Sequence, residues 1–164
     1  MMEKKNKVRS KEMLIGLRKI TQAIDLHSKY LLKTFGITSP QLVILQELME
    51  CSSLTISELA QTISLTQGTV TTIVARLEKN TLVSRKRSGE DKRRIHISIT
   101  EEGKKLLKST PSPLQERFAN SYYALEEWEQ LMILSSINRI VSMMSAEKIE
   151  ASPFLMSGPL DNGS

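Results

Sequence analysis

Apolar positions in the first part of the chain repeat with a helical period. From Met13, apolar side chains advance in steps of three and four, a spacing of about 3.5 with which one helix faces another. The series is Met13, Leu17, Ile20, Ile24 and Leu31, with His27 in its one gap. Gly36 stands where a left-handed cap is expected, and Pro40 opens a second helix. The pattern predicts two helices, preceded by a basic, flexible lead-in over residues 1–11.

Two further helices are predicted after a short polar stretch. Thr55 and Glu58 have the spacing of a capping box, which starts a short helix there. Thr66 can cap another helix, after a turn of three or four residues. The apolar residues of this last helix are Val70, Ile73, Val74 and Leu77. Two helices joined in this way form a helix-turn-helix.

The opposite face of the helix that starts at Thr66 is small, hydroxylated and free of carboxylates. A helix of about 14 residues spans ~20 Å and fits the major groove of DNA, about 12 Å wide. Carboxylates on such a helix would be repelled by the phosphates on both walls of the groove. We therefore expect contact with double-stranded DNA from Thr66, Gln67, Gly68, Thr69, Thr71, Thr72 and Arg76.

Residues 83–99 combine alternation with a dense group of cations. Ile95, Ile97 and Ile99 alternate with polar residues, the period-2 pattern of a strand with one buried face, and Gly89 lies where a turn would fall. The stretch predicts a β-hairpin rather than a flexible basic tail. Its cations are Arg85, Lys86, Arg87, Lys92, Arg93 and Arg94. On a hairpin beside a groove-binding helix, they would reach phosphates and the neighbouring minor groove.

The last part of the chain is predicted to be helical. Thr100 can cap a helix whose first turn is acidic, and Pro111 and Pro113 must interrupt it because each lacks an amide donor. A long helix is expected over about residues 125–144, and an irregular tail over residues 149–164. The long helix carries one apolar stripe, made of Leu131, Leu134, Ile137, Val141 and Met144.

Composition and charge sharpen this reading. The 164 residues carry a formal charge of +5, and the cations gather in residues 1–19 and 85–94, which is the footprint of a polyanion binder. Aromatic residues make up 4%, which disfavours base stacking on single strands. One cysteine, Cys51, excludes an internal disulfide and fits a reducing, cytoplasmic location. The sequence has no apolar run of the roughly 20 residues that a membrane-spanning helix needs, so we expect no membrane span.

The sequence contains no constellation that favours catalysis. Two histidines and one cysteine are scattered, and no glycine-rich phosphate loop is present, so we expect no catalytic residues, no metal and no cofactor. Cys51 could sense peroxide, but the residues around it offer no cations to activate a thiol, which favours an inert role. His27 lacks ligand partners at helical spacing. Trp128 and the nearby methionines could line an effector pocket, although packing in a dimer is the simpler interpretation.

The order of these motifs resembles the MarR-type (multiple-antibiotic-resistance) transcriptional regulators. The resemblance covers roughly residues 10–145 and is densest in residues 54–107. Leu59-Ala60 matches the short helix, and Gln67-Gly68-Thr69-Val70-Thr71 matches the recognition helix, which ends with Arg76-Leu77-Glu78. Asp91-Lys92-Arg93 matches the wing motif, and Ile99-Thr100-Glu101-Glu102-Gly103 the closing motif. Their order and spacing together are specific, although each one alone is weak.

The resemblance implies a mainly α fold with a small β-hairpin: a winged helix-turn-helix with N- and C-terminal dimerisation helices. It implies a homodimer that represses transcription from near-palindromic sites. A small-molecule effector of unidentified chemistry, or an oxidant, would release this dimer from DNA. In the family, the wing arginine enters the minor groove and the wing aspartate holds it, roles that fall on Arg93 and Asp91 here. We therefore assign residues 12–38 and 100–148 to dimerisation, and residues 39–99 to DNA binding.

The sequence departs from the family pattern at a few places. Asn80 stands where glycine is usual, and asparagine tolerates the left-handed backbone that we expect there. The Pro111-Ser112-Pro113 break and the tail are less typical, and the tail is similar to that of the ectoine and compatible-solute branch of the family. The alternative to a DNA-binding regulator is a helix-turn-helix protein used only for protein–protein contact, although the cationic hairpin disfavours it.

Overall fold

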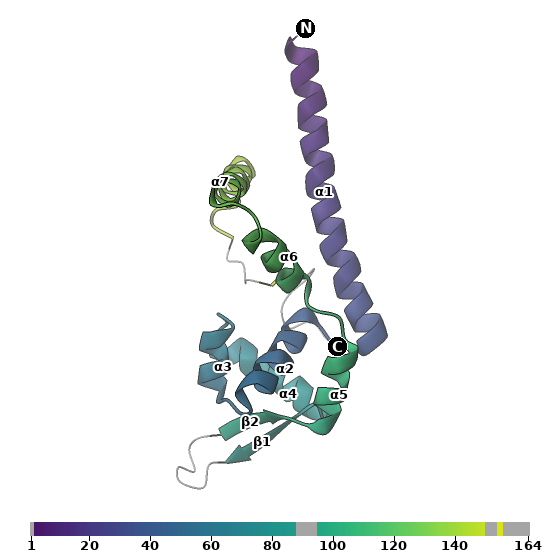
Figure 1. Ribbon diagram of the computed structural model, residues 1–164, viewed down its shortest axis with the longest axis vertical. Helices are drawn as coiled ribbons and strands as arrows, with labels where there is room; N and C mark the ends of the chain where they lie inside the picture. The colour runs from purple at the N-terminus through teal and green to yellow at the C-terminus, as the bar shows by residue number, and fades with distance from the viewer. Residues whose placement is uncertain (1, 88–94, 150–153, 156–164) are drawn as a thin grey trace. The chain divides into compact units, whose positions relative to one another are not determined.

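The computed structural model of the chain describes residues 2–87, 95–149 and 154–155 (Figure 1). Within these ranges it contains seven helices and one two-stranded antiparallel sheet. The elements are α1 (Met2–Phe35), α2 (Ser39–Cys51), α3 (Ile56–Thr62), α4 (Gln67–Lys79), β1 (Val83–Arg87), β2 (Ile95–Ile99), α5 (Glu101–Ser109), α6 (Leu114–Tyr123) and α7 (Glu127–Met143). The predicted fold class, mainly α with a small β-hairpin, is confirmed.

The chain forms two compact units, of which the second runs from Ser112 to Phe154. In the first unit, α2 packs against α4, α5 and β2, while α3 packs against α4 and β2. The core of this unit is apolar and fully buried, which is the main source of its stability. Its principal side chains are Leu42, Ile44, Leu45 and Leu48 from α2, Leu59 from α3, Val70, Ile73, Val74 and Leu77 from α4, and Ile97 from β2.

Local chemistry explains where these helices begin and end. Gly36 has φ +68°, the left-handed conformation predicted for it after α1. The Thr55 amide donates to the Glu58 carboxylate at 2.7 Å and the Thr55 hydroxyl accepts from the Glu58 amide, so the predicted capping box opens α3. Thr66 caps α4 and Thr100 caps α5 through the hydroxyl alone, which accepts the amide three residues later. No helix among the described residues is both long and apolar enough to cross a membrane.

The hairpin is tied to the helical layer through its second strand. β1 pairs with β2 in the register Val83↔Ile99 to Arg87↔Ile95. Leu54, between α2 and α3, exchanges backbone hydrogen bonds of 3.0 and 2.8 Å with Ile97 and so extends the sheet on the other side of β2. Ile97 is fully buried and Ile99 is half-buried, whereas Ile95 is exposed. The predicted alternation therefore holds near the base of the hairpin and is lost toward its tip.

Two local expectations differ from the structure. α1 begins at Met2, so residues 2–11 continue the helix that we expected to start near Met13 (Figure 1). Asn80 caps α4 with φ −88°, and its neighbour Thr81 takes the left-handed conformation, with φ +59°. The reversal of the chain therefore falls one residue later than the sequence suggested. The Thr81 hydroxyl bonds to the Asn80 carbonyl at 2.7 Å, a local contact that accompanies this unfavourable backbone.

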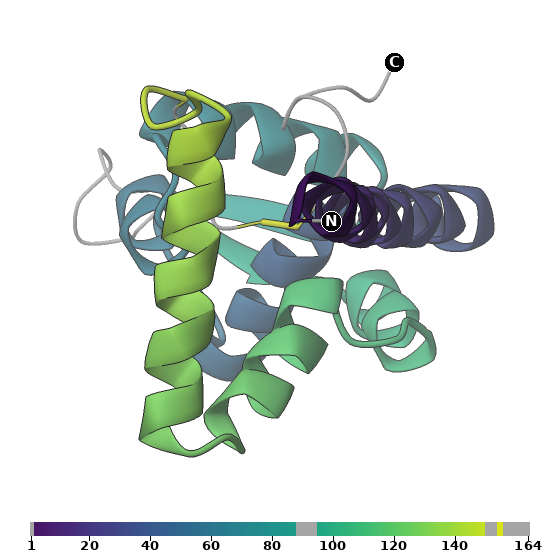
Figure 2. The same ribbon diagram turned by 90° about the horizontal axis from the view of Figure 1, so that it is seen from above.

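The helices in the last part of the chain are interrupted where the sequence predicts a break. α5 ends at Ser109 and α6 begins at Leu114, so the two prolines separate them as expected. α5, which the sequence analysis assigns to the dimerisation region, also packs against α2 of the same chain. α7 then runs without a break over 17 residues (Figure 2). None of the residues of α7 is buried in the single chain, which leaves its apolar stripe uncovered.

Candidate nucleic-acid interface

Helix α4 has one buried face and one open face. Its four apolar residues are buried against the rest of the first unit, as predicted. Around the open face, Gln67, Gly68, Thr71 and Thr72 are exposed, while Thr69 and Arg76 are half-buried. Ala75 and Lys79 are also exposed on this face, although the sequence analysis did not select them as site residues. The helical period could have found them, because they lie seven and eleven positions after Gly68.

The N-terminal end of α4 is capped without a carboxylate. The Thr66 hydroxyl accepts the Thr69 amide at 3.2 Å and lies 2.9 Å from the Thr69 hydroxyl. No acidic residue occurs in the first turn of the helix. The partial positive charge of the helix N-terminus therefore stays available to an external anion.

The hydroxyl groups on the open face bond back to the helix itself. Thr71 Oγ1 donates to the Gln67 carbonyl at 2.7 Å, and Thr72 Oγ1 donates to the Gly68 carbonyl at 3.1 Å. The side-chain amide of Gln67 donates to Ser57 Oγ on α3 at 3.3 Å. Each of these three side chains therefore has a hydrogen-bond partner within the chain.

Cations continue from α4 onto the first strand of the hairpin. Arg76 and Lys79 lie in the last turn of α4, and Lys86 and Arg87 are exposed on β1. Arg85 differs from them, because its Nε lies 3.0 Å from Glu78 Oε2 and its Nη2 is buried. The structure therefore joins β1 to the end of α4 through Arg85. Asp91, Lys92, Arg93 and Arg94 lie outside the described residues, so their roles remain predictions.

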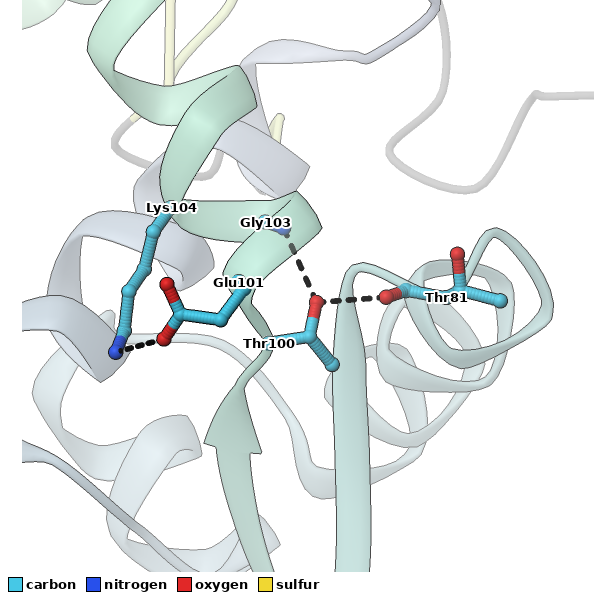
Figure 3. A network of polar contacts seen from close by, with 5 residues as sticks. All are labelled: Thr81, Thr100, Glu101, Gly103 and Lys104. Atoms are coloured by element: carbon cyan, nitrogen blue, oxygen red, sulfur yellow. Dashed lines mark hydrogen bonds and ion pairs between the residues drawn. The ribbon is translucent and has the colours of Figure 1, made fainter.

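The base of the hairpin is fastened by residues of the closing motif (Figure 3). The Thr100 hydroxyl donates to the Thr81 carbonyl at 2.7 Å and accepts the Gly103 amide at 3.1 Å. The Thr100 amide donates to the Leu82 carbonyl at 3.0 Å. One threonine thus caps α5 and holds the segment between α4 and β1 at the same time.

Glycine is required at position 103 by close packing. A Cβ there would overlap the Leu82 carbonyl oxygen and would lie 2.7 Å from Ile99 Cγ1. At Gly68, by contrast, a Cβ would meet only Thr66 Oγ1, at 3.9 Å. Gly103 is therefore needed because the interior of the protein leaves no room for a side chain, whereas Gly68 leaves open space on the outer face of α4.

Two carboxyl groups near this framework have shifted pKa values. The Lys104 ammonium donates to Glu101 at 2.7 Å, and this hydrogen bond, together with the charge of Lys104, holds the pKa of Glu101 below its usual value (Figure 3). On α2, partial burial raises the pKa of Glu47, and the charge of Glu50 adds to the rise. Among the described residues no group of three or more metal-binding side chains occurs.

The remaining sequence candidates lie apart from α4 and the hairpin in the chain. Cys51 is a free, exposed thiol at the last residue of α2. His27 is half-buried on α1, and Trp128 is exposed on α7.

Comparisons with known proteins agree with this architecture. The family model described as "Transcriptional regulator SarA/Rot" matches residues 27–110. An uncharacterized HTH-type transcriptional regulator of Bacillus cereus is 33% identical over 131 residues, which cover 77% of this chain and 86% of that protein. The HTH-type transcriptional regulator FarR of Neisseria gonorrhoeae is 31% identical over 126 residues, 75% of this chain and 84% of FarR.

A solved structure shares the fold. The crystal structure of the S. aureus MepR–DNA complex superimposes with a TM-score of 0.57 at 25% identity, over 78% of this chain and 94% of that one. The MarR-type resemblance predicted from the sequence is thereby confirmed. The chain belongs to the SarA/Rot family of transcriptional regulators, which are winged-helix proteins of the MarR type.

Proposed function

We propose that the chain is a homodimeric repressor that binds near-palindromic sites in double-stranded DNA. The observation that carries this proposal is the open face of α4, which has no carboxylate over its first ten residues and leads into four exposed or half-exposed cations. These cations are Arg76, Lys79, Lys86 and Arg87. The family membership and the DNA complex solved for MepR support it. A dimer that occupies a promoter site blocks it physically, so repression is the proposed regulatory outcome.

On DNA, α4 would lie in the major groove with its N-terminal half toward the base edges. The N-terminal end of α4 would face a phosphate, since Thr66 caps the helix without adding negative charge. Lys86 and Arg87 would contact the backbone beside the groove. Arg93 is the residue proposed to enter the minor groove, with Asp91 orienting it, as the family resemblance implies.

Two copies are needed to match the two halves of a palindrome. α1 exposes Val8, Met13, Leu14, Ile15, Ile20, Leu26, Tyr30 and Leu32. α7 exposes Trp128, Leu131, Met132, Ile133, Leu134, Ile137 and Met143. Apolar surface on this scale is a feature of an interface rather than of a solvated monomer. We propose that the terminal helices of a second copy cover it.

The test is the binding of purified full-length protein to random-sequence duplex DNA at several salt concentrations. With four or five phosphates neutralised per protomer, the log–log salt slope of a dimer is expected to be on the order of −8. A second measurement uses Arg93→Ala, which is expected to weaken binding while the dimer remains folded. Absence of binding even at low salt would favour the alternative, a module used only for protein–protein contact.

A further inference from the structure

The open face of α4 offers methyl groups and hydrogen-bond acceptors, and few hydrogen-bond donors. We infer that Thr71, Thr72 and Ala75 recognise DNA by contact with the 5-methyl groups of thymine. This inference rests on the proposed function and adds to it a chemical class of base that the helix selects. It follows from the direction of the hydrogen bonds, from the positions of the charges and from the space at Gly68.

The hydroxyl protons of Thr71 and Thr72 are already donated within the helix. A threonine hydroxyl has one proton to donate. Thr71 gives it to the Gln67 carbonyl at 2.7 Å and Thr72 gives it to the Gly68 carbonyl at 3.1 Å. Both side chains are exposed, so the groups left for a partner are the γ-methyl and the oxygen lone pairs. Donation to the N7 or O6 acceptors of guanine would require these internal bonds to break.

The positions of the charges also disfavour the recognition of guanine by the N-terminal half of α4. Residues 66–75 contain no charged side chain, and the first cation of α4 is Arg76 near its C-terminal end. The bidentate pairing of arginine with guanine is therefore absent from the N-terminal half of the helix, the part that reads base edges in helix-turn-helix proteins. Ala75, three residues after Thr72, adds another exposed methyl group to the same surface.

Gly68 explains how these methyl groups reach the bases. Nothing within the protein requires a glycine there, because a Cβ would meet only Thr66 Oγ1, at 3.9 Å. Gly68 lies one helical turn before Thr72 on the exposed face. The missing side chain thus allows the helix backbone to approach the floor of the groove. The thymine methyl is the apolar group that lies there, and threonine and alanine methyls are its usual contacts.

The experiment removes single methyl groups from both sides of the contact. The full-length protein first enriches duplexes from a random-sequence pool, and the enriched duplex is then synthesised with deoxyuridine in place of each thymine in turn. Deoxyuridine pairs with adenine as thymine does and lacks only the 5-methyl group. At thymines that face α4, we expect affinity to fall about fourfold in one half-site and about 15-fold in both, the loss for one buried methyl-sized group per site.

Matched variants identify the protein partner of each methyl group. Thr71→Ser and Thr72→Ser remove the γ-methyl and keep the hydroxyl, so one or both should bind the thymine duplex about as weakly as the wild type binds the uracil duplex. The serine variant that loses the contact should show no further loss with deoxyuridine. Thr72→Val keeps a methyl group in place and should remain sensitive to the base change.

Each outcome separates the inference from the function on which it rests. Equal affinity for thymine and uracil duplexes at every position overturns methyl recognition and leaves DNA binding intact. Serine variants that both keep full sensitivity to deoxyuridine also overturn it. Salt-dependent binding of the pool without enrichment of any sequence would likewise overturn methyl recognition and leave DNA binding intact. Only a failure to bind any duplex at low salt would remove the proposed function, and the inference with it.

Discussion

The Nε atom of Arg85 on β1 lies 3.0 Å from the Oε2 atom of Glu78 on α4, and this ion pair connects the hairpin to that helix. The Nη2 atom of the same guanidinium is buried, so Arg85 is turned toward the protein rather than outward. Lys86 and Arg87, the next residues, are exposed. Neighbouring cations on one strand therefore have different surroundings, which predicts different effects on DNA binding.

The first prediction concerns this difference. Lys86→Ala should reduce the magnitude of the salt slope by about 1 per protomer, because one phosphate contact is lost. Arg85→Ala should weaken specific binding and leave the slope unchanged, since Arg85 positions the hairpin without meeting a phosphate. Affinity for one duplex at four or more salt concentrations measures both slopes. A slope reduced equally by the two variants would mean that Arg85 also contacts the DNA backbone.

The second prediction concerns the stability of the hairpin base. Gly103→Ala should lower the free energy of unfolding by about 1 to 3 kcal/mol, because the new Cβ overlaps the Leu82 carbonyl and crowds Ile99. Gly68→Ala is the matched control. It should raise the free energy of unfolding by about 0.5 to 1 kcal/mol, since its Cβ meets no obstacle and alanine is the better helix former. Urea unfolding followed by circular dichroism measures both values.

The third prediction tests the double role of Thr100. Thr100→Val removes the cap of α5 and the bond to the Thr81 carbonyl, so unfolding should become easier by about 1 to 2 kcal/mol. Thr100→Ser keeps both hydrogen bonds and should cost much less. Amide exchange of Gly103 should also quicken in the valine variant. Equal stability of the valine and serine variants would show that the hydroxyl contacts contribute little.

The fourth prediction concerns dimerisation. Ile137→Glu places a charge on the exposed apolar stripe of α7 and should shift the protein toward monomer, because a carboxylate in an apolar interface is poorly solvated. Arg139→Glu introduces the same residue two positions later, away from the stripe, and serves as the control. Sedimentation velocity gives the oligomeric state of each. A wild-type protein that sediments as a monomer would contradict the proposal for α1 and α7.

The fifth prediction follows from the raised pKa of Glu47. Partial burial and the charge of Glu50 raise that pKa, so the folded chain binds this proton more tightly than the unfolded chain does. The ionised carboxylate therefore costs stability at neutral pH, and this cost disappears as the pH falls through the raised pKa. Glu47→Gln should be more stable than the wild type at pH 7, and the difference should shrink toward pH 4. Urea midpoints at the two pH values test this, and a difference that is independent of pH would contradict it.

Features of the site that depend on residues close in sequence could be predicted. Thr55, Thr66 and Thr100 cap the expected helices, and Pro113 separates α5 from α6, because caps and breaks depend on residues three or four apart. The open face of α4 was visible for the same reason: its four apolar residues define the buried side, and the rest must face outward.

Features that depend on tertiary contact were missed. The pair Glu78–Arg85 joins a helix to a strand across a turn, and no sequence pattern shows that Glu78 is the partner of Arg85. The left-handed residue is Thr81 instead of Asn80, the position after the C-cap, where the Thr81 amide donates to the Glu78 carbonyl at 2.9 Å. This end of α4 was missed although its bonds are local, because the preference of asparagine for the left-handed region placed it one residue too early. The back-bonding of Thr71 and Thr72 also required coordinates, because a hydroxyl has several local partners to choose from.

The bridge between Leu54 and Ile97 has a consequence for how the hairpin can vary between related proteins. β2 is bonded to β1 on one side and to Leu54 on the other, while Thr100 and Gly103 lock the strand where it ends. The register at the base of the hairpin is therefore supported by contacts on both edges of β2. If the chain binds DNA as proposed, exchanges of charge on the exposed residues Lys86 and Arg87 would change the contacts with DNA while the base of the hairpin stays held by Leu54 and Thr100.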